Sequence, residues 1–206
     1  PHGYSNYELT ALDRMVLTEL YRLVEECVKG YEQMDFFTSA QMIRRFVWSV
    51  FADHYVEAVK ARAYNVDNSF DGREQAGAWE TLHLCLKTIL KLLAPICPFM
   101  TDAIWRKMYS TQPIHEEKFP KPEESWMSEY GEITQSFMEF NSVVWKYKKS
   151  KNMSLNEGLQ AAYAPKILEP LQRDLKAMHK IKNLFFGEPS SQTEKVDKMG
   201  GVYLKA

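Results

Sequence analysis

The stretch "RRFVWSVFADHYVEAVKAR", residues 44–62, combines many aromatic and branched residues with cations at both of its ends. On an α-helix, where successive residues are about 100° apart, its apolar residues cover well over half of the circumference. These apolar residues are Phe46, Val47, Trp48, Val50, Phe51, Tyr55, Ala58 and Val59, and the remaining polar stripe is Arg45, Ser49, Asp53, Glu57 and Lys60. The pattern predicts a mostly buried helix.

Arg44 and Arg62 lie on the apolar side of this helix, at its two ends. Two interpretations stay open for them: their stems cover apolar surface, or their guanidinium groups make bidentate contacts to phosphate. For Trp48, Phe51 and Tyr55, packing in the core is favoured over stacking on a nucleic-acid base, because the helix is so apolar.

Apolar residues at helical spacing predict further helices on both sides of this stretch, over residues 7–29 and 72–93. Thr38 or Ser39 is expected to cap the helix that contains residues 44–62. Pro95 and Pro98 end the helix before them, and a short helix restarts with Thr101 as its cap. The sequence therefore predicts a mainly α bundle of three long helices and a short one.

The second half of the chain changes in character. A proline-rich segment is expected to lie as a strap across the bundle, and an amphipathic helix follows it. The helix is expected over residues 128–149, and then a strand, a helix and two strands over residues 159–164, 167–178, 181–187 and 200–205. We expect a bundle with its strap over residues 1–125. A connecting helix and a small α+β appendage are expected over residues 126–206.

Composition excludes several classes of protein. With 206 residues, 45% of them hydrophobic, and a net charge of −1, the chain is not a strongly basic binding module. It has no apolar run long enough to span a membrane, and its first residues lack a signal peptide's basic and apolar regions, so we expect a cytoplasmic protein. Cys27, Cys85 and Cys97 have no metal-binding or disulfide spacing, so buried free thiols and no metal are expected.

No catalytic motif is recognisable, and we assign no catalytic residue. A pocket built from Asp53, His54 and Glu57 is a weaker possibility, since three such neighbours do not share one helix direction, and His54 is expected to be a hydrogen-bonded core histidine. The clearest basic patch is "WKYKKSKNMSLNEG", residues 145–158. It is either a solvated helix end or an edge that follows phosphates, with Trp145 or Tyr147 available for stacking.

The order of four segments carries a resemblance to a known family. The segments are "ALDRMVLTEL", "YEQMDFFTSAQMIRRFVWSVFADHYVEAVKAR", "AWETLHLCLKTILKLLAPICPFMTDAIW" and "PIHEEKFPKPEE". They resemble the anticodon-binding helix bundle of class I aminoacyl-tRNA synthetases, over roughly residues 7 to 160. Asp102 and Ala103 replace the family's usual acidic pair, and Phe119 stands where the family has Trp; neither departure casts doubt on the fold.

Within the family, "VVWKYKKSKNMSLNEGLQAAY" looks like the corresponding element of archaeal-type valyl enzymes, with the isoleucyl enzymes as the alternative. The resemblance implies that this chain binds tRNA and that a catalytic domain of the same polypeptide, absent here, uses ATP. No cofactor is expected in this part. The residues expected to contact tRNA are Arg44, Arg45, Trp48, Lys60, Arg62, Lys146, Lys148 and Lys149.

A competing hypothesis is a helical protein-interaction module that keeps the fold without binding RNA. Near-neutral net charge is compatible with it. RNA binding requires Arg44, Arg45, Lys146, Lys148 and Lys149 to lie on one continuous face, so their positions discriminate between the two hypotheses.

Overall fold

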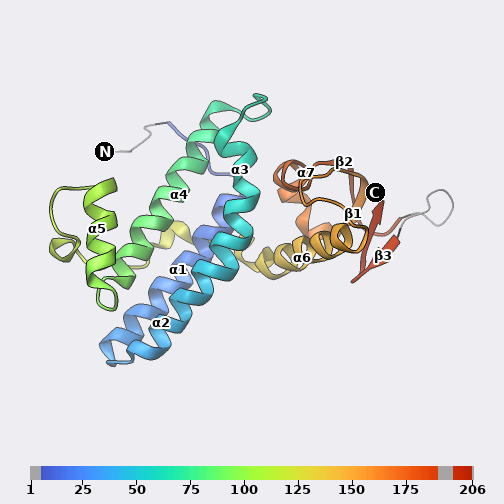
Figure 1. Cartoon of the computed structure of the whole chain (residues 1–206). Helices are drawn as coiled ribbons and strands as arrows, with labels where there is room; N and C mark the ends of the chain where they lie inside the picture. Colours follow the sequence, from blue (N-terminus) through green and yellow to red (C-terminus); the bar gives the residue numbers. More distant parts are fainter. Residues whose placement is uncertain (1–5, 190–196, 206) are drawn as a thin grey trace.

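The computed structural model describes residues 6–189 and 197–205, which form a helix bundle joined to a small α+β appendage (Figure 1). The bundle contains α1 (Ala11–Glu32), α2 (Phe36–Arg45), η1 (Phe46–Val56), α3 (Glu57–Tyr64), α4 (Gly72–Leu93) and α5 (Pro98–Met108). The strap contains the 3₁₀ turns η2 (Ile114–Glu116) and η3 (Glu124–Trp126), and a third 3₁₀ turn, η4 (Glu129–Ile133), leads directly into the connecting helix. The remainder is α6 (Thr134–Ser150), β1 (Leu159–Ala164), η5 (Lys166–Leu171), α7 (Gln172–His179), β2 (Ile181–Phe186), β3 (Asp197–Met199) and β4 (Val202–Lys205). The predicted mainly α bundle with an α+β appendage is confirmed.

Several helix starts differ from the sequence prediction. The helices expected from residues 7, 128 and 167 begin at Ala11, Thr134 and Gln172, the last two after a 3₁₀ turn, and two predicted caps are wrong. The cap of α2 is Asp35, whose side chain accepts the Thr38 backbone N–H at 2.9 Å, so neither Thr38 nor Ser39 is the cap. Helix α5 begins at Pro98 rather than at Thr101, because proline fits the first helical position, where no N–H is needed. The predicted start of α4 near Gly72 is confirmed, with Asp71 accepting the Arg73 backbone N–H.

The opening stretch of sequence does not form a regular α-helix. Residues 46–56 are a π-helix, continuous with α2 before it and α3 after it. In an α-helix, the sixteen residues from 46 to 62 would make four full turns and about 160° more, which would place residues 46 and 62 on opposite sides of the helix. The i→i+5 bonds of the π-helix over residues 46–56 widen the turn to roughly 4.4 residues, so a step of four residues falls about 30° short of a full turn there. This offsets the excess of about 40° per step in the α-helix that follows, and residues four apart stay on one face along the whole stretch. Five buried side chains follow this spacing, at Phe46, Val50, His54, Ala58 and Arg62, and Tyr55 and Val59 are buried beside them.

The same geometry turns Trp48 outward. Its side chain is 64% exposed, so the expectation that Trp48 packs in the core is wrong. Tyr55 is fully buried and Phe51 partly buried, as expected. His54 is buried and contacts Asn141 of α6 at 3.2 Å, which confirms the hydrogen-bonded core histidine.

The appendage has a four-stranded sheet in the order β2-β1-β4-β3. β1 is parallel to β2 and antiparallel to β4, and β3 is antiparallel to β4. Strand β3 is an addition to the three predicted strands, and residues 190–196 lie outside the described part of the chain. One buried cluster continues from Leu12 of α1 to Leu204 of β4, so the proposed division after residue 125 stays a prediction.

Two further expectations concern the thiols and the membrane. Cys27 and Cys85 are buried and free, as expected, while Cys97 is only partly buried. Burial raises the pKa of Cys27 to about 11, which makes it an inert thiol at neutral pH. Within residues 6–189 and 197–205, we find no helix with the length and apolarity that crossing a bilayer requires.

Candidate nucleic-acid interface

An exposed cluster of two arginines and a tryptophan lies on the outer face of α2 and η1. Gln41, Arg44, Arg45, Trp48 and Ser49 line a shallow hollow of about 350 Å³ there. The spacing of three or four residues between them is what places side chains on the same helix face. In the described part of the chain, neither Arg44 nor Arg45 has a carboxylate within ion-pair distance, so both guanidinium groups are available to a ligand. We call these five residues the outer hollow.

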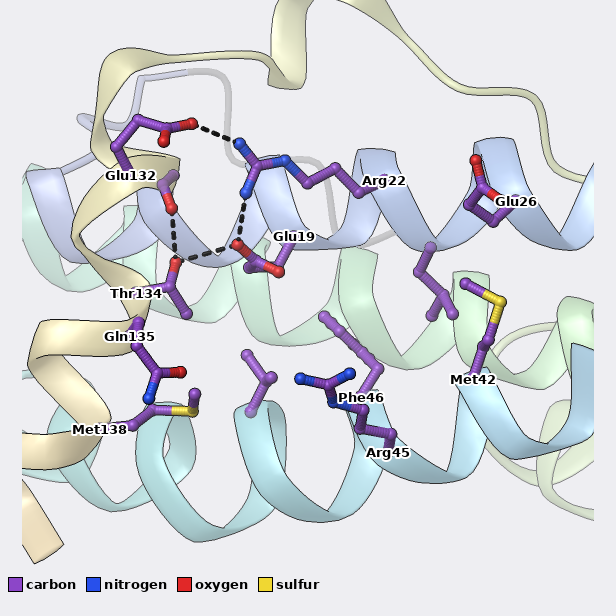
Figure 2. A pocket seen from close by; sticks show the side chains of 13 residues that line it. Glu19, Arg22, Glu26, Met42, Arg45, Phe46, Glu132, Thr134, Gln135 and Met138 are labelled. Atoms are coloured by element: carbon purple, nitrogen blue, oxygen red, sulfur yellow. Dashed lines mark hydrogen bonds and ion pairs between the residues drawn. The ribbon is translucent and has the colours of Figure 1, made fainter. Parts of the chain in front are cut away.

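A second cavity adjoins the outer hollow and shares Arg45 with it. This groove, of about 410 Å³, lies between α1, the α2–η1 helix and the start of α6 (Figure 2). Its apolar lining comes from Leu23, Met42, Phe46, Val50 and Met138. Its polar lining comes from Glu19, Arg22, Glu26, Arg45, Glu132, Thr134 and Gln135. An apolar cleft with a few polar groups at its rim is suited to a planar ligand that also forms hydrogen bonds.

The polar groups of the groove are largely paired with one another. Arg22 forms ion pairs with Glu19 at 2.9 Å and with Glu132 at 2.6 Å, and the Thr134 hydroxyl donates to Glu19 at 3.0 Å (Figure 2). Figure 2 shows this network on one side of the groove and Arg45 with Gln135 on the other. The charge of Arg22 is thus neutralised locally, whereas Arg45 can meet an anion at the mouth of the groove.

The structure contradicts the expectation that Arg62 contacts tRNA, because its side chain is completely enclosed. The guanidinium group is bidentate with Asp13, at 2.7 and 2.8 Å, and its Nε donates to Asp174 at 3.2 Å. Tyr55 also donates to Asp13, at 2.8 Å. Arg62 therefore connects α1 and α3 of the bundle to α7 of the appendage. It holds the two parts together and has no surface to offer to RNA.

Charges in this network perturb one another. Burial by itself would lower the pKa of Arg62, because it disfavours the charged form. The hydrogen bonds and negative charge of Asp13, together with the charge of Asp174, outweigh this effect, so the pKa of Arg62 is raised. Burial raises the pKa of Asp174 to about 6, against the opposing influence of Arg62. Removal of the cation would leave two buried carboxylates without their main partner.

Lys148 is likewise wrong as a tRNA contact. It is fully buried, and its ammonium group donates to the carbonyl oxygens of Leu155 at 2.9 Å and His179 at 3.0 Å. Burial, and then the charge of Lys180, lower its pKa. Lys148 joins α6 to the segments that follow it, so the expected continuous face of five cations does not exist.

The two aromatic residues of the basic run are also engaged in the interior. Tyr147 is buried and donates to Asp197 at 2.9 Å, so it is not available for stacking. The Trp145 ring lies 5.2 Å from the His54 ring and 6.0 Å from the His179 ring. Burial, followed by the charges of Lys148 and His54, lowers the pKa of His179 to about 3. The imidazole is therefore neutral inside this packed junction.

The remaining predicted cations are exposed but dispersed. Lys60 pairs with Glu57 on α3, and Lys146 and Lys149 lie on the surface of α6. None of the three lines the outer hollow or the groove. The structure thus brings together Arg44, Arg45 and Trp48 among the eight predicted residues.

Sequence reasoning also missed residues of both cavities. Gln41 could have been found, since it lies four residues before Arg45 on the same helix face. The groove could not have been found from the sequence, because Glu19, Arg45 and Glu132 come from three separate segments. The alternative catalytic pocket is not formed: His54 is buried, while Asp53 and Glu57 are exposed.

Comparison with known proteins places this geometry in a family. The family model described as the anticodon-binding domain of tRNA ligase matches residues 13–163, which include the bundle, the strap, α6 and most of β1. The valine–tRNA ligase of Pyrobaculum aerophilum is 37% identical over 99% of this chain, and that of Aeropyrum pernix is 34% identical over 98%. The chain spans about a quarter of the length of these relatives, 25% in both cases. The chain therefore belongs to the family of anticodon-binding domains of tRNA ligases.

Proposed function

We propose that this chain is the anticodon-binding region of a cytoplasmic valine–tRNA ligase. It holds the anticodon stem and loop of valine tRNA while a catalytic domain in the rest of the polypeptide aminoacylates the tRNA with ATP. The family match and the relatives' names support this proposal, and valine is preferred to isoleucine because these relatives are valine–tRNA ligases. The structural observation that carries it is the exposed Arg44–Arg45–Trp48 cluster at the outer hollow.

Each side chain of the cluster has a distinct role in this proposal. Arg44 and Arg45 bind phosphates of the loop, because planar guanidinium groups form bidentate contacts with them. Trp48 offers its ring to an unstacked base, which is how proteins commonly bind the exposed bases of RNA loops. The groove beside Arg45 then accommodates a neighbouring base, which packs against the apolar lining of Met42, Phe46 and Met138. Lys60, Lys146 and Lys149 add contacts to more distant phosphates.

One observation favours the alternative, a protein-interaction module. Large apolar side chains are exposed around the α1–α2 turn and the start of α5: Met34 is 76% exposed, Phe37 75% and Phe99 91%. Exposed apolar surface of this kind often marks a contact with another protein surface. A module of that type would bind no RNA at low salt, which separates the two functions.

Replacing Trp48 with alanine is expected to weaken binding of a valine anticodon stem-loop by about tenfold or more, since base stacking contributes about 1–3 kcal/mol per base. Stability should change little, because the ring is 64% exposed. Fluorescence anisotropy with labelled RNA measures the affinity, and circular dichroism measures the melting temperature. Tyr64→Ala is the control, as Tyr64 is 75% exposed on α3 and lines neither cavity. Equal losses in both variants, or no loss in either, would contradict the assignment of Trp48.

A further inference from the structure

The charge of the chain is divided unequally along its length. Residues 134–206 contain 12 of the 26 Lys and Arg residues but only 7 of the 27 Asp and Glu residues, a surplus of five positive charges. Residues 1–133 have 14 cations and 20 anions, a surplus of six negative charges. The overall charge of −1 therefore conceals a basic second part, formed by α6 and the appendage, joined to an acidic bundle and strap. Residues 159–206 alone contain 8 cations and 5 anions, a surplus of three positive charges. A local surplus of this size attracts a polyanion.

One face of the appendage sheet carries a row of aromatic side chains. The register pairs Phe185 of β2 with Tyr163 of β1, Tyr163 with Tyr203 of β4, and Tyr203 with Lys198 of β3. The rings of Tyr163 and Phe185 are stacked with centroids 4.9 Å apart, and those of Tyr163 and Tyr203 meet edge to face at 6.4 Å. Three aromatic rings and a lysine thus cross all four strands at one level, and we call these four residues the aromatic row.

The aromatic row faces away from the helices. Strand residues one position away, such as Ala162 and Leu204, are completely buried and belong to the core cluster that contains Val144 of α6 and Leu175 of α7. Because alternate strand residues point to opposite faces, the row lies on the other side of the sheet. Phe185 is 44% exposed, and Tyr163 and Tyr203 are partly exposed.

Cations lie beside the rings on the same face. The ammonium group of Lys198 is 5.1 Å from the centre of the Tyr203 ring. Lys205 is exposed two residues after Tyr203, and it pairs in the register with Ala161, two residues before Tyr163. Aromatic rings and two lysines therefore occur together on this face of the sheet.

We propose that this sheet face binds single-stranded RNA, with bases stacked on Phe185 and Tyr203 and phosphates contacted by Lys198 and Lys205. Four-stranded sheets with exposed aromatic side chains are an established geometry for stacking unpaired bases, and this stacking tolerates any base because each has a π-face. The surplus of positive charge favours RNA over an acidic or apolar protein partner. This second RNA site is separate from the outer hollow and does not depend on the function proposed for it.

The test uses the whole chain and a labelled ten-nucleotide oligouridine, which has no stem and no anticodon. The wild-type chain is expected to bind it with an affinity that falls as salt rises, and to bind a duplex RNA of equal length more weakly. Phe185→Leu keeps an apolar side chain but removes the ring, and should weaken oligouridine binding about tenfold. Lys198→Gln should lower the slope of log affinity against log salt by about one.

Two control variants make the result specific. Ile167→Ala changes a side chain of the appendage that is 49% exposed on η5, outside the sheet, and should leave binding unchanged. Tyr64→Ala changes an exposed aromatic side chain of α3, outside both the sheet and the outer hollow, and should also leave oligouridine binding unchanged. Phe185→Leu is also titrated with the anticodon stem-loop, and a larger loss for oligouridine than for the stem-loop distinguishes failure of the sheet face from failure of the outer hollow. The proposal is overturned if the wild-type chain does not bind oligouridine at low salt. It is equally overturned if duplex binds as tightly, or if Phe185→Leu, folded by circular dichroism, binds normally.

Discussion

Replacement of Arg62 with methionine is expected to lower the free energy of unfolding by about 3–5 kcal/mol, the usual cost of breaking a buried ion pair by removing one partner. Asp13 would lose both of its bidentate bonds to the guanidinium group, and Asp174 would lose its bond to Nε. Both carboxylates are within the interior, so water cannot replace what is lost. Urea unfolding followed by circular dichroism measures the change.

Lys60→Met is the matched control, because Lys60 lies on the same helix, two residues away, with its side chain 50% exposed. It should change stability little, as exposed ion pairs contribute little. The result that contradicts our assignment is an Arg62→Met variant that keeps its full stability and loses RNA affinity. That pattern would mean that Arg62 contacts RNA, as the sequence alone led us to expect.

Lys148→Met is expected to lower the free energy of unfolding by about 3 kcal/mol, since hydrogen bonds from a charged group contribute about 1.5–3 kcal/mol each. Methionine fills a similar volume but cannot donate to the carbonyl oxygens of Leu155 and His179. Both oxygens are acceptors at the junction between α6 and the sheet, so the loss should be greatest in the appendage. Hydrogen exchange of the α6, β1 and β2 amides locates the effect.

The neighbouring residue provides the opposite expectation. Lys149 is exposed, so Lys149→Met should leave stability unchanged and reduce the salt slope of stem-loop binding by about one. Of these two adjacent lysines, Lys148 is thus expected to stabilise the fold and Lys149 to contact RNA. An unchanged unfolding free energy in Lys148→Met, combined with a reduced salt slope, would reverse this assignment.

The sequence predicted the helices well because their apolar spacing, caps and prolines are local signals. It mispredicted the residues of η1 because a regular α-helix was assumed, and the π-helix changes which side chains share a face. Arg62 shows the limit most clearly. Its position on the apolar side was a visible signal, but its partners Asp13 and Asp174 lie 49 and 112 residues away in sequence.

The strands were predicted to different extents for a physical reason. β1, β2 and β4 carry enough apolar and β-branched or aromatic residues to be recognised. β3 has three residues, Asp197–Met199, and forms at the edge of the sheet only because β4 offers unpaired backbone groups. The aromatic row was equally hidden, since Tyr163, Phe185 and Tyr203 become neighbours only through the register.

The central claim is that this chain recognises the anticodon of valine tRNA, and one comparison tests it directly. Labelled stem-loops that differ only in the anticodon, valine against isoleucine, are titrated with the wild-type chain across a salt series. The account predicts tighter binding of the valine stem-loop at every salt concentration, because base contacts differ while phosphate contacts are shared. Equal, salt-sensitive binding of the two stem-loops, tighter binding of the isoleucine stem-loop, or no binding at low salt would contradict it.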